Sequence, residues 1–288
     1  MRLLGTLFLV VGRLVITFGA TWLNVVSPRL EKLPAGYRHE DVFEGTYRVL
    51  DPATGQLDEI PVTIQQLRET VANKGNEATI KETVTTLLPT GQPVPQFPTT
   101  ETMVVVDRVT RAYLPGGDVQ RSGSLSLPLD VKPDVEYPIW VGNTGRALPA
   151  KYTGTGEVEG LEVYLFTISG TDLALTPDPQ SGLPRVSDAH IELKVEPRSG
   201  ATVDTVSQTS ISLMHPQAGK TPMFVSTISF TDDNVARSAS DAKAARTQLI
   251  MVGSYMPWLL MGLGMLLALA GISLYGLFCW RRMRAAKA

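Results

Sequence analysis

Two long apolar segments, one near each end, constrain this chain more than any other feature of its sequence. Leu3–Val26 and Leu259–Trp280 are each long enough to cross a hydrocarbon core about 30 Å thick as a helix that rises about 1.5 Å per residue. Residues 27–248 hold all 28 acidic side chains but only 20 basic ones, and hence a net charge of −8. We therefore expect a two-span membrane protein whose middle part folds in water.

The basic residues behind the second apolar segment predict its orientation. Lys and Arg beside a span stay in the cytoplasm, so two spans place both termini there and residues 27–248 outside a bacterial plasma membrane. Tryptophan, which favours membrane interfaces, fits this topology. The predicted interface residues are Trp22 and Trp258 on the outer side and Trp280, Arg281, Arg282 and Arg284 on the inner side.

A cleaved signal peptide is the alternative for the N-terminal segment. Arg13 interrupts its apolar run, and Phe18–Gly19–Ala20 is a poor small-x-small cleavage site. We therefore expect an uncleaved anchor.

Arg13 itself has three interpretations, because the second span offers no acidic partner. It reaches inner-leaflet headgroups by snorkelling, pairs with an acid on another protein or copy, or contacts an anionic lipid. A charge in mid-span costs on the order of 3 kcal/mol on insertion scales. Gly264 and Ala268 have small-xxx-small spacing, which permits close helix packing and predicts a further membrane or partner contact.

The segment between the spans is typical of a mainly β domain. Short β-branched runs alternate with Gly, Pro, Asn and Asp, and residues 89–100 form a Pro-rich loop. Turns around Gly160 and around Ser199–Gly200 predict hairpins. We expect an antiparallel β-sandwich or a barrel-like fold.

Two segments need separate interpretation. Residues 62–75 fit either a helix or a hairpin that turns at Lys74–Gly75–Asn76, and we favour the hairpin. After Phe230, Thr231 is a candidate N-cap of a stalk helix, and Pro257 marks a kink or a new helix. The predicted parts are a transmembrane helix (1–26), a β-rich extracytoplasmic domain (27–230), a stalk helix (231–250), a second transmembrane helix (251–280) and a basic tail (281–288).

Several stretches in this order resemble a family of two-span envelope proteins from actinobacteria and related bacteria, labelled the PorA-like porin family and of unknown function. They are "SPRLEKLP" (27–34), "VVVDRVT" (104–110), "YPIWVG…LPAKYTGTGEVEGLEVYLF" (137–166) and "FTDDNVA…DAKAARTQL…PWLLMGLG" (230–264). The resemblance implies two spans and an extracytoplasmic β-rich domain, and no established catalytic residues. The architecture is also similar to that of the class B scavenger receptors, an analogy of fold alone.

No enzyme or metal signature stands out. His39, His190 and His215 are scattered without the close spacing of metal ligands, and we expect no catalytic residue and no cofactor. Trp140, with Tyr137 and Tyr152 nearby, is either a core anchor or an aromatic wall for a lipid or glycan. The acidic middle segment argues against nucleic acid.

The sequence therefore favours a non-enzymatic envelope protein whose external domain binds or passes a lipid or an envelope ligand. The alternative is a structural subunit of a larger membrane complex, recognised through its spans by a membrane protein or a second copy. A hollow domain would favour the first interpretation, and a solid core the second.

Overall fold

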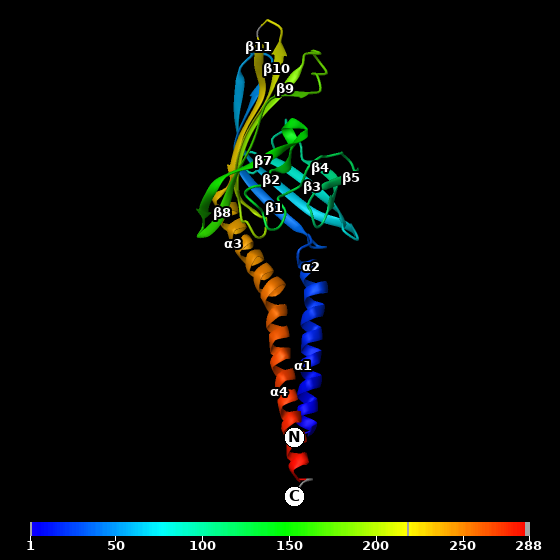
Figure 1. Cartoon of the computed structure of the whole chain (residues 1–288). Helices are drawn as coiled ribbons and strands as arrows, with labels where there is room; N and C mark the ends of the chain where they lie inside the picture. The colour runs from blue at the N-terminus through cyan, green and yellow to red at the C-terminus, as the bar shows by residue number, and fades with distance from the viewer. Residues whose placement is uncertain (1, 218, 286–288) are drawn as a thin grey trace. The chain divides into compact units, whose positions relative to one another are not determined.

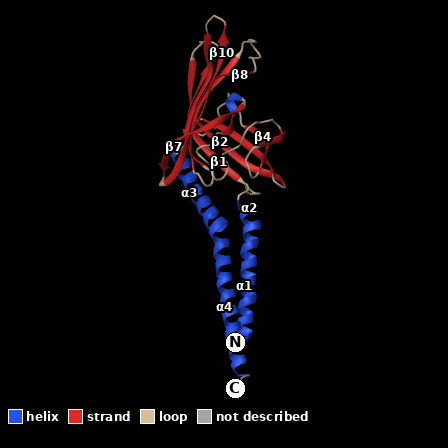
Figure 2. Cartoon of the chain, viewed as in Figure 1, coloured by secondary structure: helices blue, strands red, loops and turns tan. Residues whose placement is uncertain are grey.

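The structure is a computed structural model that describes residues 2–217 and 219–285. The chain divides into two compact units, Met1–Lys32 with Ala245–Ala288 and Leu33–Ala244. Helices make up the first unit and strands dominate the second (Figure 2). The helices are α1 (Arg2–Thr21), α2 (Ser27–Leu30), α3 (Asp232–Gln248) and α4 (Met256–Ala285), with π-helical turns at Trp22–Val26 and Leu249–Tyr255 and a 3-10 turn at Gly142–Thr144.

Two helical stretches are long and apolar enough to cross a membrane. They are Arg2–Leu30 and Asp232–Arg284, and each contains one of the two segments expected from the sequence. Within the second stretch, α4 begins at Met256, one residue before Pro257 and directly after a π-helical turn. Two such stretches are expected of a membrane protein.

Glycines spaced seven residues apart bring α1 and α4 into contact. Gly5, Gly12 and Gly19 are the buried residues of α1. A Cβ added to Gly12 would lie 2.7 Å from both the Gly264 carbonyl oxygen and the Ala268 backbone nitrogen. Backbones can approach this closely only where side chains are absent, the arrangement that drives helix association in lipid.

Eleven antiparallel strands form one sheet in the second unit, as expected for the mainly β fold (Figure 1). Its order is β5-β4-β3-β2-β1-β11-β10-β9-β8-β7-β6, so the first strand pairs with the last. The strands are β1 (Arg38–Leu50), β2 (Leu57–Lys74), β3 (Glu77–Leu87), β4 (Thr100–Asp107), β5 (Tyr113–Gly117), β6 (Tyr137–Val141), β7 (Arg146–Val158), β8 (Leu161–Leu175), β9 (Arg185–Val195), β10 (Thr202–His215) and β11 (Gly219–Phe230).

The predicted hairpins are confirmed. β2 and β3 meet at Lys74 and Glu77 across a two-residue loop in which Gly75 has φ +65°. β7 and β8 are joined by Glu159–Gly160, both with positive φ, the conformation that suits the twist of paired strands. Ser199–Gly200 lies in the loop between β9 and β10.

A short segment joins the two edges of the sheet. Ser124 pairs with Ala112, directly before β5, and also with Ile139 in β6. The Ser124 amide donates to the Pro138 carbonyl, and the Leu125 amide donates to the Arg111 carbonyl. The sheet thereby closes into a barrel, and register shifts in several strand pairs, such as that between Thr70 and Ala72, help it to curve.

The helix α3 packs on the outside of this barrel. Thr231 Oγ1 accepts a hydrogen bond from the Asn234 amide, so the predicted N-cap is confirmed. Ala239 and Ala242 are buried against Leu161, Val163 and Val203, which lie on β8 and β10. Small residues on α3 therefore let the helix lie close to the strands.

The helix contact predicts which glycine tolerates a side chain. Gly12→Val should lower the thermal stability of the detergent-solubilised full chain by about 1–3 kcal/mol, the usual effect of overpacking. The matched control is Gly262→Val, because an added Cβ at Gly262 meets no atom within 4 Å. Thermal unfolding followed by helical circular dichroism measures both, and equal effects would contradict the proposed packing.

Candidate functional site

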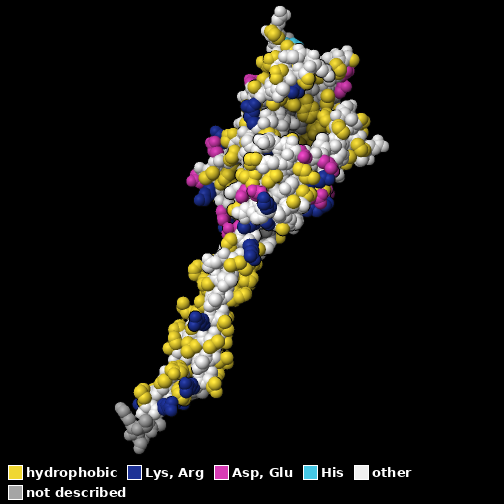
Figure 3. Space-filling view, turned by 90° about the vertical axis from the view of Figure 1, so that its right-hand side faces the viewer, with side chains coloured by type: hydrophobic (Ala, Val, Ile, Leu, Met, Phe, Trp, Pro, Cys, Tyr) yellow, Lys and Arg dark blue, Asp and Glu magenta, His cyan; other side chains and the backbone are white. Residues whose placement is uncertain are grey.

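The barrel of the second unit is hollow. A cavity of about 600 Å³ lies inside it, bounded by inward-facing side chains of most of its strands. The space-filling view shows a deep recess with hydrophobic side chains in its wall (Figure 3). Small-molecule sites usually measure about 300–1,000 Å³, so the cavity is of ligand size.

Apolar side chains line much of the cavity. Alternate residues of a strand point to the same face, so strands such as β2, β10 and β11 contribute every second side chain. On β10 these are polar and small, Thr205, Ser207 and Thr209. The apolar lining includes Phe43, Ile64, Val84, Ile168, Ile191, Leu193, Ile228 and Phe230.

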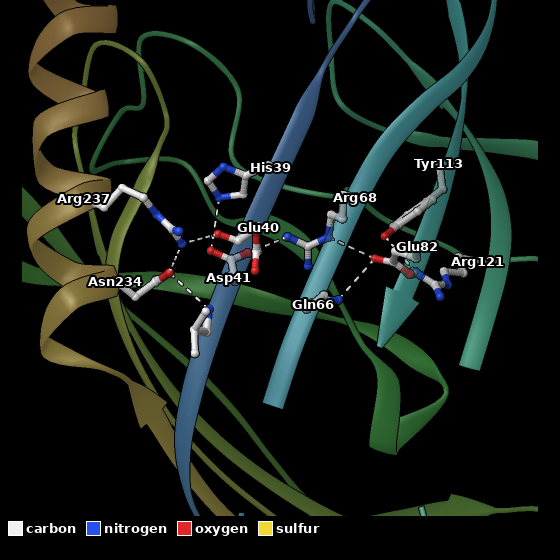
Figure 4. Close-up of polar contacts among 11 residues, drawn as sticks. His39, Glu40, Asp41, Gln66, Arg68, Glu82, Tyr113, Arg121, Asn234 and Arg237 are labelled. Carbon is white, nitrogen blue, oxygen red and sulfur yellow. Dashed lines mark hydrogen bonds and ion pairs between the residues drawn. The ribbon is translucent and has the colours of Figure 1, made fainter. Parts of the chain in front are cut away.

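A buried ion-pair network lies in the wall on β1, β2 and β3 (Figure 4). Arg68 Nη1 is 3.0 Å from Asp41 Oδ2, and Arg68 Nε is 3.0 Å from Glu82 Oε1. Arg121 Nη1 is 2.6 Å from Glu82 Oε2. Only 6% of each carboxylate side chain is exposed, so both acids depend on these arginines.

Strand register produces this network. Arg68 of β2 lies directly opposite Glu82 of β3, and opposite His39 of β1 on its other side. Asp41 is two residues beyond His39, so it points to the same face and lies diagonally from Arg68, within reach of a long side chain. Asp41 Oδ1 is also 3.1 Å from His39 Nε2.

The arginines keep both acids ionised. Burial alone would raise the pKa of Glu82, but the positive charges of Arg68 and Arg121 outweigh it and lower that pKa. Burial likewise opposes ionisation of Asp41, and contacts with His39 and Arg68 bring its pKa below the ordinary value. The network therefore stays charged at neutral pH.

Arg121 joins the network to an aromatic pair. Its guanidinium carbon is 5.5 Å from the centre of the Tyr113 ring and 5.7 Å from that of Trp140. Arg121 Nη1 also donates to the Tyr113 hydroxyl over 3.2 Å. Such cation–π contacts stabilise a partly buried arginine.

The helix α3 is tied to the same region of β1 (Figure 4). The Val42 amide donates to Asn234 Oδ1 over 3.1 Å. Arg237 donates to the Glu40 carbonyl and to Asn234 Oδ1. These bonds fix the start of α3 beside the network.

The three aromatic residues singled out in the sequence occupy different places. Trp140 lines the cavity, beside Arg121. Tyr137 and Tyr152 pack edge-on against Phe166, in the hydrophobic core cluster of β7, β8 and β9. A ligand-binding role for the three stays a prediction, for which only Trp140 has a side chain at the cavity.

The membrane-segment residues lie in the helical unit. Arg13 is exposed on α1, whereas Gly264 lies in the contact between α1 and α4 and Ala268 beside it. Trp22 Nε1 donates to the Val252 carbonyl, Trp258 is 64% exposed, and the Arg284 guanidinium lies 3.9 Å from the centre of the Trp280 ring. Arg281 and Arg282 are exposed.

Groups suited to metal chemistry do not gather in the part of the chain that the structure describes. No three His, Cys, Asp or Glu side chains lie close enough there to hold an ion. His190 lies beside Glu192, and Cys279 is a half-buried free thiol of α4.

Arg68, Glu82 and Asp41 were not predicted as site residues from the sequence. A signal was present, because Arg68 follows Ile64 and Gln66, and Glu82 follows Ile80, each on the inward phase of its strand. A charge on a buried face demands a partner. Which partner it finds depends on the register, which becomes visible only in the fold.

A comparison with protein-family models gives one match. The model of the family described as Porin PorA covers residues 4–273, which is most of both units. The chain belongs to this family. No curated protein matches the chain. The PorA-like resemblance drawn from the sequence is thus confirmed at the level of the family.

The ion-pair network predicts unequal losses of stability for two arginines. Arg68→Met should cost about 3–5 kcal/mol of unfolding free energy, because it leaves two buried acids with fewer partners. Arg38→Met should cost about 0–1 kcal/mol, because the Arg38 side chain is 63% exposed in its pair with Glu69. Urea unfolding of the full chain in detergent, followed by fluorescence, measures both. Equal losses would show that the buried network adds no stability.

Proposed function

We propose that this PorA-family chain is a non-enzymatic envelope protein whose barrel holds an amphipathic, lipid-like ligand. The observation that carries the proposal is the cavity of about 600 Å³ inside residues 33–244. A scaffold has no need of a hollow core, because protein interiors normally pack as tightly as organic crystals.

The lining supports an amphipathic ligand over a purely polar one. Phe43, Ile228 and Phe230 offer apolar contact on adjacent strands, whereas Arg68 and Glu82 place charge in the same cavity. An apolar chain would gain about 25 cal/mol for each Å² removed from water. Fixed polar groups would orient the other end of the ligand.

The family name suggests a pore, and the helices of one chain do not supply one. The contact at Gly12 and Gly264 leaves no room even for a methyl group. We therefore base the proposal on the barrel cavity and not on passage between α1 and α4.

Filling the cavity tests the proposal. Ser207 of β10 lines it, and its neighbours across the sheet, Ile191 and Ile228, line it too. The next residue, Gln208, is exposed on the opposite face. Ser207→Trp should therefore expel a bound ligand, whereas Gln208→Trp should leave it in place.

The measurement is mass spectrometry of lipids that co-purify with the full chain in mild detergent. Wild type and both variants have the same helices and should carry the same helix-bound lipids. The difference between Ser207→Trp and Gln208→Trp therefore reports ligand bound in the barrel. We expect at least tenfold less of one amphipathic species with Ser207→Trp. Identical lipid profiles would contradict binding and favour the alternative, a scaffold subunit that contacts a membrane-protein partner or a second copy.

We further propose that both termini are cytoplasmic and that residues 27–248 are extracytoplasmic. Arg281, Arg282 and Arg284, beside the second candidate span, support this orientation. Protease added to sealed spheroplasts should digest the β unit and spare a tag placed after Ala288. Digestion of that tag would reverse the topology.

A further inference from the structure

One arginine of the cavity lining lacks an acidic partner. Arg111 lies in the turn that joins β4 to β5, is 8% exposed and lines the cavity. Its Nη1 donates to the Arg108 carbonyl over 2.6 Å. Among the described residues, no carboxylate lies within ion-pair distance of its guanidinium, which has five N–H donors.

The backbone at Arg111 is also unusual. Its φ is +66°, a left-handed conformation that costs most residues about 1–2 kcal/mol. Burial and the nearby charge of Arg108 lower the pKa of Arg111, and Tyr37 and the more distant carboxylate of Asp107 offset this only in part. Arginine nevertheless remains charged in proteins, so the turn holds a buried cation at the cavity wall. Strained residues of this kind cluster at ligand sites.

The charges around the cavity do not cancel. Arg68, Arg111 and Arg121 line it, and they face two carboxylates, Asp41 and Glu82. Both carboxylates are already bound by Arg68 and Arg121. The lining thus holds one more arginine than carboxylates, and the arginine without an ion pair is Arg111. This excess lies inside a domain whose overall charge is negative.

A second donor lies close to Arg111. Tyr37 also lines the cavity, and the two side chains interact electrostatically. Burial raises the pKa of the Tyr37 phenol, so its hydroxyl stays protonated and can donate a hydrogen bond. Leu33 and Leu125 also line the cavity and belong to the same hydrophobic cluster as Tyr37.

We propose that Arg111, assisted by Tyr37, binds the anionic headgroup of an amphipathic ligand, a phosphate or a carboxylate. The apolar part of that ligand then lies along the Phe43 and Ile228 side of the cavity. A guanidinium suits both anions, since its planar donors match two oxygens at once. The inference rests on the proposed function, because it names the ligand class of the same cavity.

The test uses the full chain in nanodiscs made of zwitterionic lipid, so that no anionic headgroup of the bilayer competes with the probe. Two photoreactive probes share one alkyl chain, and one ends in a phosphate and the other in an alcohol. Peptide mapping counts only the label on strands β1 and β11, so probe dissolved in the bilayer does not enter the measurement. Inorganic phosphate serves as a competitor without an alkyl chain.

We expect the alkyl phosphate to label these strands at least tenfold more efficiently than the alcohol. Arg111→Gln should remove that preference, a loss of about tenfold to a hundredfold for one charged hydrogen-bonding partner. Labelling by the alcohol should not change, which also shows that the variant folds. Arg111→Lys should keep part of the preference. Arg108→Gln is the control, because Arg108 lies on the same turn and does not line the cavity.

Three outcomes would overturn the inference. If both probes label wild type and Arg111→Gln equally, the anion site is wrong and the proposed lipid-binding function stands. If neither probe labels the strands, the proposed function fails with it. If millimolar inorganic phosphate abolishes labelling by the alkyl phosphate, the site takes a free anion and not a lipid headgroup.

Discussion

Closure of the sheet through residues 123–125 is the constraint on which the rest of the β unit depends. A sheet of eleven strands left open would expose two edges, each a row of unpaired backbone groups that invites association. Ser124 and its neighbours cover part of both edges at once, since their backbone bonds to Arg111 and Tyr113 on one side and to Pro138 and Trp140 of β6 on the other. Closure also creates an interior, and barrel diameter grows with strand number, so eleven strands leave room for a cavity. The cavity is a consequence of the closure, and the inward phase of each strand determines its chemistry.

The buried charges on β1, β2 and β3 make one part of the cavity wall polar, whereas much of the remaining wall is apolar. Arg68 binds acids on both neighbouring strands, so replacing it by an apolar residue would leave two buried carboxylates with one partner fewer each. A network of this kind adds little net stability relative to a well-packed apolar core. Its value lies in keeping polar groups at fixed places in a cavity that is otherwise apolar. Arg121 extends that polar wall to Tyr113 and Trp140 through its guanidinium face.

Local chemistry made much of the fold predictable. Gly75, Glu159–Gly160 and Thr231 act through their own backbone or through a neighbour a few residues away, so the two turns and the helix cap could be recognised in sequence. The apolar end segments were equally predictable, because their length and composition alone indicate a membrane span. The closing segment was not, since it contributes one short bridge on each side and carries no strand pattern. The candidate site was missed for a related reason. Arg68 and Glu82 are 14 residues apart, and only the register of β2 with β3 sets them opposite each other.

The pairing of β1 with β11 has a consequence for assembly in the membrane. The Thr231 amide donates to the Val42 carbonyl, so the point where the chain leaves the barrel is bonded to the strand by which it enters. Residues separated by most of the sequence thus become close neighbours once the barrel forms. Helices α1 and α4 are then joined through the barrel, so their encounter is intramolecular and depends on effective concentration. The glycine contact between α1 and α4 therefore does not have to bring together two independent chains.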